Sequence, residues 1–339
     1  MGIQPADLPN WMSKLQNDNY VSSLSIPGTH DSAAFTRTLT PFVQTQTINF
    51  TEQLNAGIRF FNLRVNFVPY LRPRDLLLQL VHGPINLGII LKDVFQEIYG
   101  WLDTHIGEAV FVQIKQDGSL PPCLTMTDFT NNLFGLINQD SNYWRTNTDI
   151  PKMSDLQFTS GPKRHSKIQL IRRFDLANQV PPSNAGLDVT NWDDNSDRCP
   201  IVASPPNPAP TVIVQDHYGW VYADGDTSIV FEKKYNVVNA LMIEAASSSP
   251  PTNVWYFNYV SAVRAQPITA AINPFQFAHG MYDVDLDPTF IKGENLRIYT
   301  FLKAATTSKR YGVLMFDFPT DSEAPNLAFQ IVQNNTFRP

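Results

Sequence analysis

The sequence predicts an α/β protein built on a single irregular or distorted (β/α)8 barrel of the TIM type. Strand-like apolar runs recur along the chain, helix-like segments separate most of them, and polar residues follow most of the runs. Alternating strands and helices favour a parallel sheet with right-handed crossovers, and eight strands favour closure into a barrel. An open doubly wound sheet is the alternative, but no glycine-rich nucleotide loop follows the first strand.

The strands are expected where Val, Ile, Leu and Phe form nearly continuous runs, as in a sheet buried on both faces. These runs are residues 21–26, 58–65, 76–81, 109–115, 168–173, 211–216, 253–259 and 311–317. Helices are expected at 87–105, 126–137, 227–246 and 324–332, and residues 3–20 form a leading helical or irregular segment. Together these elements give one domain over residues 1–339, with the catalytic barrel at about 20–335.

Two irregular stretches interrupt this pattern, residues 116–125 and the loop insertion 178–210, which is rich in Pro, Asn and Asp. Both follow expected strands, so both should lie at the mouth of the barrel. Each contains one of the two cysteines, Cys123 and Cys199. A disulfide and two free thiols are equally compatible with this placement.

Composition excludes several classes of function. Hydrophobic residues make up 43% and charged residues 17% of the chain, which predicts a sizeable core. A net charge of −6 without a Lys/Arg cluster argues against nucleic-acid binding. Apolar runs stay below the 18 residues of a membrane span, and residues 1–10 do not resemble a signal peptide. We expect a soluble monomer and leave its compartment, secretion included, open.

The polar residues at the strand ends are the strongest functional signal. They are His30, Asp31, Arg64, His82, Lys115, Arg173, Asp216, Tyr218 and Asp317. A barrel brings the carboxyl ends of its strands to one mouth, so these side chains should converge. Two histidines beside carboxylates favour a general base and a general acid, and the cations favour an anionic substrate such as a phosphodiester. The remaining Asp and Tyr suit the hydroxyls of a polyol.

Two of these stretches resemble the histidine motifs of the bacterial phosphatidylinositol-specific phospholipase C family, within the wider PLC-like phosphodiesterases. They are Ser25-Ile26-Pro27-Gly28-Thr29-His30-Asp31-Ser32 and Leu80-Val81-His82-Gly83-Pro84. The order of Lys115, Ile171-Arg172-Arg173-Phe174, Val214-Gln215-Asp216-His217-Tyr218 and Phe316-Asp317 agrees with later motifs of the family. The resemblance extends over roughly residues 20–320 and implies an incomplete TIM barrel.

The resemblance implies cleavage of phosphatidylinositol by its own 2-hydroxyl, giving a cyclic inositol phosphate and diacylglycerol. His30 would deprotonate the hydroxyl, and His82 would protonate the leaving oxygen. Asp317 would orient His30, Asp31 would support His82, and Arg64 would bind the phosphate. The inositol ring would then be held by Lys115, Arg173, Asp216 and Tyr218, with Asn62 and Gly83 also at the substrate.

Arg64 and Asn62 bear on metal dependence. A guanidinium at the position of calcium-binding oxygens resembles the metal-independent bacterial branch, so no metal or other cofactor is expected. Asn62 departs from the family, which typically has Asp two residues before this arginine. A neutral amide leaves Arg64 with one fewer nearby counter-charge. Two alternatives stay open, the first because the loop 178–210 and Asn62 could together remodel the pocket. The chain would act on a soluble phosphodiester, or it would be a catalytically weak barrel that binds inositol phosphate or lipid.

Aromatic residues in loops after strands indicate a second kind of contact. Trp192, Phe275 and Phe277 are expected either at a rim that touches a bilayer transiently or in ordinary loop packing. The partner that the family resemblance implies is phosphatidylinositol or a related inositol lipid.

Overall fold

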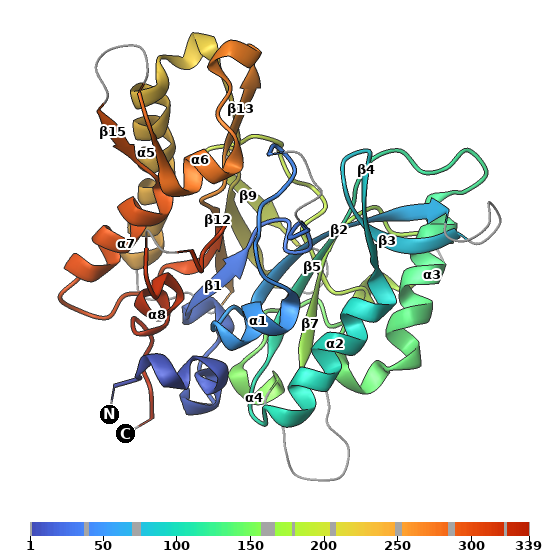
Figure 1. Ribbon diagram of the computed structural model, residues 1–339. Helices are drawn as coiled ribbons and strands as arrows, with labels where there is room; N and C mark the ends of the chain where they lie inside the picture. The colour runs from blue at the N-terminus through green and yellow to red at the C-terminus, as the bar shows by residue number, and fades with distance from the viewer. Residues whose placement is uncertain are drawn as a thin grey trace.

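Seven parallel strands of the described residues form a strongly curved sheet at the centre of the molecule (Figure 1). The computed structural model describes residues 2–36, 41–69, 76–156, 167–177, 180–203, 208–247, 253–283, 289–321 and 324–338. In spatial order the strands are β7 (Ile168–Arg173), β5 (Val110–Gln116), β2 (Phe60–Pro69), β1 (Ser25–Thr29), β16 (Gly312–Phe316), β12 (Val254–Tyr259) and β10 (Thr211–Gln215). The first and last strands of the chain, β1 and β16, are paired along Ser25–Thr29 and Gly312–Phe316.

The barrel is incomplete between β7 and β10, which do not pair within the described ranges. Short strands from the expected insertion line this opening: β8 (Leu187–Asp188) runs parallel to β7, and β9 (Cys199–Val202) runs antiparallel to β10. A further short strand, β6 (Trp144–Arg145), also pairs with β7. The predicted irregular barrel is therefore confirmed, and its irregularity lies at this opening.

The expected third barrel strand is the main correction to the predicted topology. β3 (Leu76–His82) is antiparallel to β2 and continues into β4 (Ile85–Ile90) through a two-residue turn. Two residues suffice for a hairpin, whereas a parallel strand needs a crossover of a dozen or more residues. Gly83 has φ +56°, the left-handed conformation that such a turn favours. The hairpin leaves seven strands in the barrel and delays the start of helix α2 (Leu91–Thr104).

Other boundaries differ at the ends of elements. Residues 21–23 form the 3₁₀ turn η3 (Val21–Ser23), so the first strand begins at Ser25. The last helix, α8 (Leu327–Val332), begins after Asn326, whose φ of 62° is left-handed. Helices α3 (Met126–Gln139) and α5 (Thr227–Ser247) lie where they were predicted.

The remaining elements are short or belong to the outer layers. They are η1 (Pro5–Asn10), η2 (Met12–Lys14), α1 (Phe50–Asn55), η4 (Ser141–Tyr143), α4 (Met153–Leu156), η5 (Pro182–Asn184), β11 (Gly219–Val221), η6 (Tyr222–Asp224), β13 (Val263–Gln266), η7 (Ile268–Ala270), α6 (Pro274–His279), β14 (Gly280–Tyr282), β15 (Phe290–Lys292) and α7 (Glu294–Ala304). Helices α2 and α3 cover one flank of the sheet, and α7 and α8 the other (Figure 1). The upper part of α5 joins α6, β13 and β15 in a lobe beyond the barrel.

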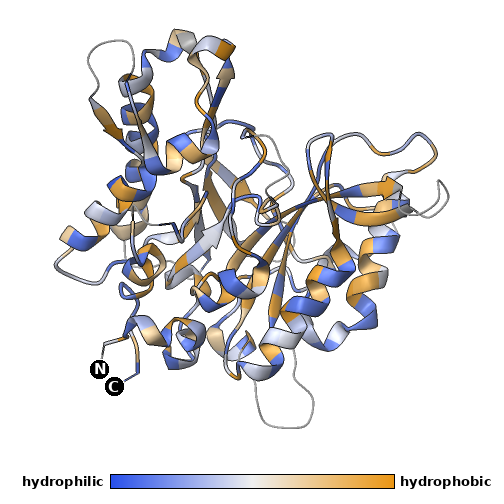
Figure 2. Ribbon diagram, viewed as in Figure 1, coloured by the Kyte–Doolittle hydropathy of each residue, from blue (hydrophilic) through white to orange (hydrophobic). Residues whose placement is uncertain are grey.

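Hydrophobic residues are concentrated in the strands and on the inner faces of the helices, and hydrophilic residues lie outside (Figure 2). One buried cluster joins α2 and α3 to the outer face of the sheet, and a second fills the barrel interior. Within the described residues, no helix is both long and apolar enough to cross a membrane. Cys123 is exposed, Cys199 is buried, and both are free thiols, so the disulfide alternative was wrong.

Candidate active site

The alternation of side chains along each strand places the candidate residues inside the barrel mouth. In a strand, residues two apart point to the same face. The buried interior residues Ile26, Phe60, Ile171, Val214 and Met315 therefore define a face, and all belong to the interior cluster. Further along that face, toward the carboxyl ends, follow His30, Asn62 and Arg64, Arg173, Asp216 and Asp317. The predicted site residues thus form polar layers above an apolar floor.

His30 is held between a carboxylate and a guanidinium. Its Nδ1 lies 2.9 Å from Asp317 Oδ1, and its Nε2 lies 2.9 Å from Arg64 Nη2. The His30 backbone is fixed as well, since its N–H donates to Phe316 O at 3.0 Å and its carbonyl accepts from Gln46 Nε2 at 2.8 Å. The Asp317 contact suits a proton on Nδ1, which leaves Nε2 as the basic nitrogen.

Asp31 joins the two histidines through one buried carboxylate. Its Oδ2 lies 3.5 Å from His30 Nε2 and 3.3 Å from His82 Nδ1, while its Oδ1 pairs with Arg64 Nε. The residue has a left-handed φ of 40°, and its N–H donates to Asn62 Oδ1 at 3.2 Å. Asn62 therefore stabilises an unusual backbone conformation that aims the Asp31 carboxylate into the site.

His82 comes from the β3–β4 hairpin rather than from a barrel strand, yet it reaches the same mouth. Besides Asp31, its Nδ1 lies 3.2 Å from Val43 O. The side chain is 23% exposed, about twice the 12% of His30. His82 is thus placed on the outer side of Asp31, where a leaving group could reach it.

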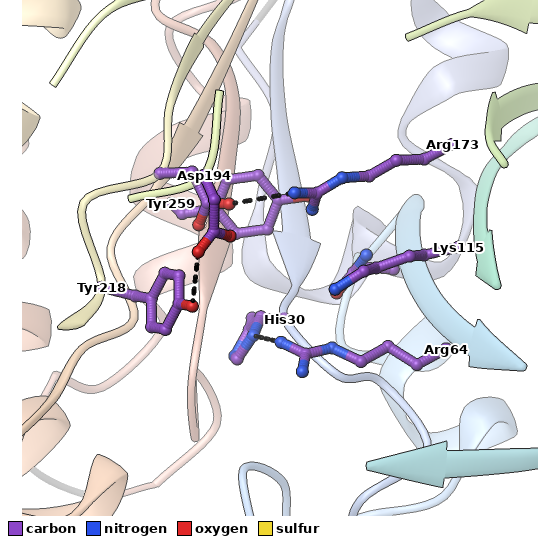
Figure 3. Close-up of a pocket in the computed structure, with 9 residues that line it drawn as sticks. His30, Arg64, Lys115, Arg173, Asp194, Tyr218 and Tyr259 are labelled. Carbon is purple, nitrogen blue, oxygen red and sulfur yellow. Dashed lines mark hydrogen bonds and ion pairs between the residues drawn. The ribbon is translucent and has the colours of Figure 1, made fainter. Parts of the chain in front are cut away.

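The inner cavity of the site has a volume of about 300 Å³ and a polar wall (Figure 3). Arg64, Lys115 and Arg173 reach into it from one side, and Asp194, Tyr218 and Tyr259 line the other. His30 lies between the two groups. Cations facing hydroxyls and carboxylates suit a ligand that carries both a phosphate and several hydroxyl groups.

A second cavity of about 380 Å³ shares His30, Arg64 and Tyr218 with the first and also contains His82. Its other lining residues are largely apolar, and include Phe42, Ala262, Val263 and Pro274. The site consequently has a polar inner compartment and a more apolar outer one, with the histidines at their junction.

Burial and neighbouring charges shift the pKa values of the two histidines in opposite directions. Burial alone would lower the pKa of His30, but the carboxylates of Asp31 and Asp317 outweigh it and raise that pKa above its ordinary value. Burial dominates at the other histidine and lowers the pKa of His82. Burial would likewise raise the pKa of Asp31, but Arg64 and the histidines hold it below its usual range, so Asp31 remains an anion.

Sequence reasoning missed three residues that complete the site, Asp117, Asp194 and Tyr259, and it expected a fourth, Trp192, at a membrane rim or in loop packing instead. Trp192 lies flat against Arg173, with the guanidinium carbon 3.6 Å from the ring centroid, and donates to Asp216 Oδ2 at 3.1 Å. Asp194 accepts from the Tyr218 hydroxyl at 3.0 Å. Asp117 and Tyr259 follow the same-face rule from Lys115 and Phe257, so alternation could have found them. Trp192 and Asp194 come from the insertion, where no regular pattern indicated that they would reach the site.

The aromatic rim differs from the expectation. Phe277 is 1% exposed and stacks on Phe231, so a membrane contact through Phe277 was wrong. Trp192 belongs to the polar cavity wall, as its contacts with Arg173 and Asp216 show. Phe275 alone among the three is substantially exposed, at 48%.

Two carboxylates enclose Arg64 where a bound cation could otherwise lie. Arg64 Nε pairs with Asp31, and Nη1 lies 3.6 Å from Asp117 Oδ2. Across the described ranges, no three His, Cys, Asp or Glu side chains are grouped as a metal site would require. The Arg64 guanidinium thus lies between the Asp31 and Asp117 carboxylates.

Comparisons with known proteins agree with this architecture, although no family model matches the chain. The 1-phosphatidylinositol phosphodiesterase of Listeria monocytogenes is 24% identical over 96% of this chain and 85% of that protein. The protein of the same name from Staphylococcus aureus strain Newman is 26% identical over 74% of each. A solved structure of the S. aureus phosphatidylinositol-specific phospholipase C, titled for the modulation of its membrane binding, has a TM-score of 0.75 at 22% identity over 97% of this chain and 98% of that one. The resemblance that the two histidine motifs indicate is confirmed.

Proposed function

We propose that this chain is a phosphatidylinositol-specific phospholipase C, which cleaves its lipid by internal attack of the inositol 2-hydroxyl. One observation carries the proposal: two histidine–carboxylate pairs, His30–Asp317 and His82–Asp31, flank Arg64 at the junction of the two cavities. This is the arrangement that acid–base transesterification at a phosphodiester requires.

The chemistry proceeds with one proton transfer on each side of the phosphorus. His30 Nε2 takes the proton of the 2-hydroxyl, whose oxygen forms a bond to phosphorus. The bond to the glycerol oxygen breaks, and His82 donates a proton to that oxygen. Arg64 stabilises the charge on the phosphate oxygens, and Asp317 stabilises the His30 imidazolium. The products are a cyclic 1,2-phosphate and diacylglycerol, and water then opens the cyclic ester with the histidines in exchanged roles.

The two cavities divide the substrate between them. Lys115, Arg173, Asp216 and Tyr218 would hold the inositol ring in the polar compartment, the role that the family resemblance implies for them, and all four line that cavity. The glycerol part extends past His82 into the outer compartment, which is lined by Phe42, Val263 and other apolar residues. The whole chain acts as one catalytic unit and as a monomer.

The order of the histidine pKa values gives a test of these roles. Activity needs neutral His30 and protonated His82, but the pKa of His30 is raised and that of His82 is lowered. The value of kcat/KM should therefore decrease at pH values below the pKa of His82 and at pH values above the pKa of His30. Asp317→Asn removes a charge that raises the pKa of His30, so the alkaline limb should move to lower pH. We also expect kcat to fall by about 10- to 100-fold as His30 loses its orientation.

The measurement is a pH profile of kcat/KM for both proteins. Asp321→Asn is the control, since Asp321 pairs with His279 at 3.5 Å rather than with His30. An unchanged alkaline limb with a shifted acidic limb would show that the assumed pKa order is reversed.

Phosphorus NMR of phosphatidylinositol vesicles with the protein, in the presence of EDTA, tests the function itself. We expect a cyclic inositol phosphate signal that EDTA does not reduce, because Arg64 occupies the place of a metal at the phosphate. Loss of activity in EDTA, restored by calcium, would refute metal independence. Turnover of a soluble inositol phosphodiester alone would favour the soluble-substrate alternative. Saturable binding of myo-inositol without turnover would favour a binding barrel.

Transient membrane contact is proposed for the lobe next to the outer cavity. Ile268 in η7 is 81% exposed and Phe275 in α6 is 48% exposed. Replacing both by alanine should weaken binding to phosphatidylinositol vesicles by about tenfold, given the apolar area removed from the bilayer. A vesicle sedimentation assay measures this binding. Ile106→Ala is the control, because Ile106 is 63% exposed and precedes the amino end of β5, away from the cavity mouth. Vesicle binding equal to that of the unaltered protein would end this proposal.

A further inference from the structure

The turn that carries Asp317 has an unusual backbone conformation directly after that residue. Phe318 has a φ of +50°, in the left-handed region that bulky side chains rarely adopt. The next residue is Pro319, and a residue before proline favours an extended conformation, so the backbone of Phe318 is strained for two separate reasons. Strain of this kind persists only where the surrounding contacts hold it in place.

Asn295, the second residue of α7, makes such contacts from the helical layer outside the barrel (Figure 1). Its Nδ2 donates to Asp317 O at 2.9 Å and to Phe318 O at 3.2 Å, and its side chain is buried. From the other side of the turn, Thr45 O accepts from the Phe318 N–H at 2.8 Å. The peptide group that joins Asp317 to Phe318 is therefore held both at its carbonyl and at its N–H.

This peptide group controls the direction of the Asp317 carboxylate, because the side chain leaves the backbone directly before it. Asp317 Oδ1 lies 2.9 Å from His30 Nδ1. Before Asp317, the carbonyl of Phe316 accepts from His30 N–H at 3.0 Å and from Gln46 Nε2 at 3.1 Å. With the preceding carbonyl fixed in this way, a rotation of the following peptide group would turn the carboxylate away from His30.

We propose that Asn295 is a positioning residue of the active site, which holds the strained peptide group after Asp317 and thereby aims the Asp317 carboxylate at His30. The inference rests on the proposed function and deepens it, because it assigns the orientation of the general base in part to an outer helix. Asn295 acts through Asp317 and does not contact the substrate.

The protonation of His30 reports where the Asp317 carboxylate lies. Burial lowers the pKa of His30, but Asp31 and Asp317 outweigh this effect and raise it, so a displaced Asp317 would lower that pKa. Other charged or titratable groups also act here: Asp31, Arg64, His82, Asp216 and Tyr259 around His30, and Lys234 behind Asp317. Among the described residues, Asn295 donates to none of these groups. A shift in the His30 titration would therefore come from Asp317.

The variants Asn295→Ala and Asn295→Ser remove the amide to different extents. Alanine loses both hydrogen bonds, whereas the serine hydroxyl can donate to one carbonyl at a time. We expect the His30 ring resonances in NMR, assigned by their loss in His30→Ala, to titrate at lower pH in Asn295→Ala and to shift less in Asn295→Ser. For cleavage of phosphatidylinositol, kcat should fall by about tenfold in Asn295→Ala, because the base is less well oriented. Asn295→Ser provides the same test if Asn295→Ala does not fold.

Asn335→Ala is the matched control, because Asn335 makes the same kind of contacts at the opposite end of the barrel. Its side chain is buried, and its Nδ2 donates to Ser25 O and to Val332 O, each at 2.9 Å. Ser25 begins β1, whereas His30 directly follows the end of that strand. We expect Asn335→Ala to lower the thermal unfolding temperature about as much as Asn295→Ala does, with the His30 titration and kcat unchanged.

Combining Asn295→Ala with Asp317→Asn tests whether Asn295 acts through the carboxylate. Asp317→Asn already removes the charge, so the added substitution should leave the His30 titration where Asp317→Asn alone places it. A His30 titration in Asn295→Ala equal to that of the unaltered protein, or a further shift in the double variant, would overturn the proposal. Inactivity of the unaltered protein would instead contradict the proposed function, and the NMR titration would still test the position of Asp317.

Discussion

Replacing His30 by alanine is expected to lower kcat by about 10²- to 10⁴-fold, the range of a lost general base. His30 contacts Asp317, Asp31 and Arg64 together, at 2.9, 3.5 and 2.9 Å. Alanine removes the nitrogen that accepts the hydroxyl proton and leaves Asp317 without its partner. The loss should appear in the formation of the cyclic phosphate and again in its hydrolysis, since the same group acts in both steps.

His217→Ala is the matched control, because His217 also pairs with an aspartate, Asp197, and stacks on Trp220 at 4.0 Å. This variant should retain kcat within a few-fold. Both are compared by phosphorus NMR under identical conditions, with thermal unfolding recorded to verify folding. If His30→Ala retained more than about a tenth of the activity, another group would have to be the base.

Replacing Arg64 by lysine is expected to lower kcat by about 10²- to 10³-fold although the positive charge remains. A lysine offers one flexible ammonium group, whereas the guanidinium contacts Asp31, His30 and Asp117 through three separate nitrogens. The ammonium group would form an ion pair with Asp31 and leave the phosphate oxygens poorly placed. KM should change less than kcat, because the lost contacts matter most as charge develops at phosphorus.

Arg198→Lys is the control for this substitution, since Arg198 forms a two-point ion pair with Glu244 outside the site. Such exposed pairs contribute little, so we expect activity and thermal stability to stay nearly unchanged. A kcat of Arg64→Lys within about fivefold of the unaltered enzyme would show that charge alone is sufficient at this position.

Much of the site could be predicted because its residues occupy the inward-facing, alternate positions near the carboxyl ends of the strands. His30, Arg64 and Asp317 each continue the inward face of a buried strand, and alternation alone places them at one mouth. The fold class followed from the same runs. Even His82, whose strand was assigned to the wrong pairing, was placed correctly at the site.

What could not be predicted depended on contacts between segments far apart in the chain. The apolar sequence of β3 is equally compatible with a barrel strand and with one strand of a hairpin. Only the two-residue turn between β3 and β4 indicates the hairpin. Trp192 and Asp194 come from an irregular insertion whose path is set by pairing with β7 and β10. Asp117 continues the face of Lys115, yet its contacts with Arg64 and Gly83 depend on how separate segments fold together.

The opening of the barrel between β7 and β10 gives the enzyme two separable halves. Of the proposed reaction centre, His30, Arg64 and Asp317 lie on or directly after β1, β2 and β16, which are paired on both sides. One wall of the polar cavity instead includes Asp194, from the segment between the two-residue strand β8 and the edge strand β9. A segment attached only at a sheet edge can change in length and composition without moving the strands beneath it. Residues 187–198 could therefore be replaced, in evolution or by design, to accept a different headgroup. The residues proposed to carry out the reaction would stay unchanged.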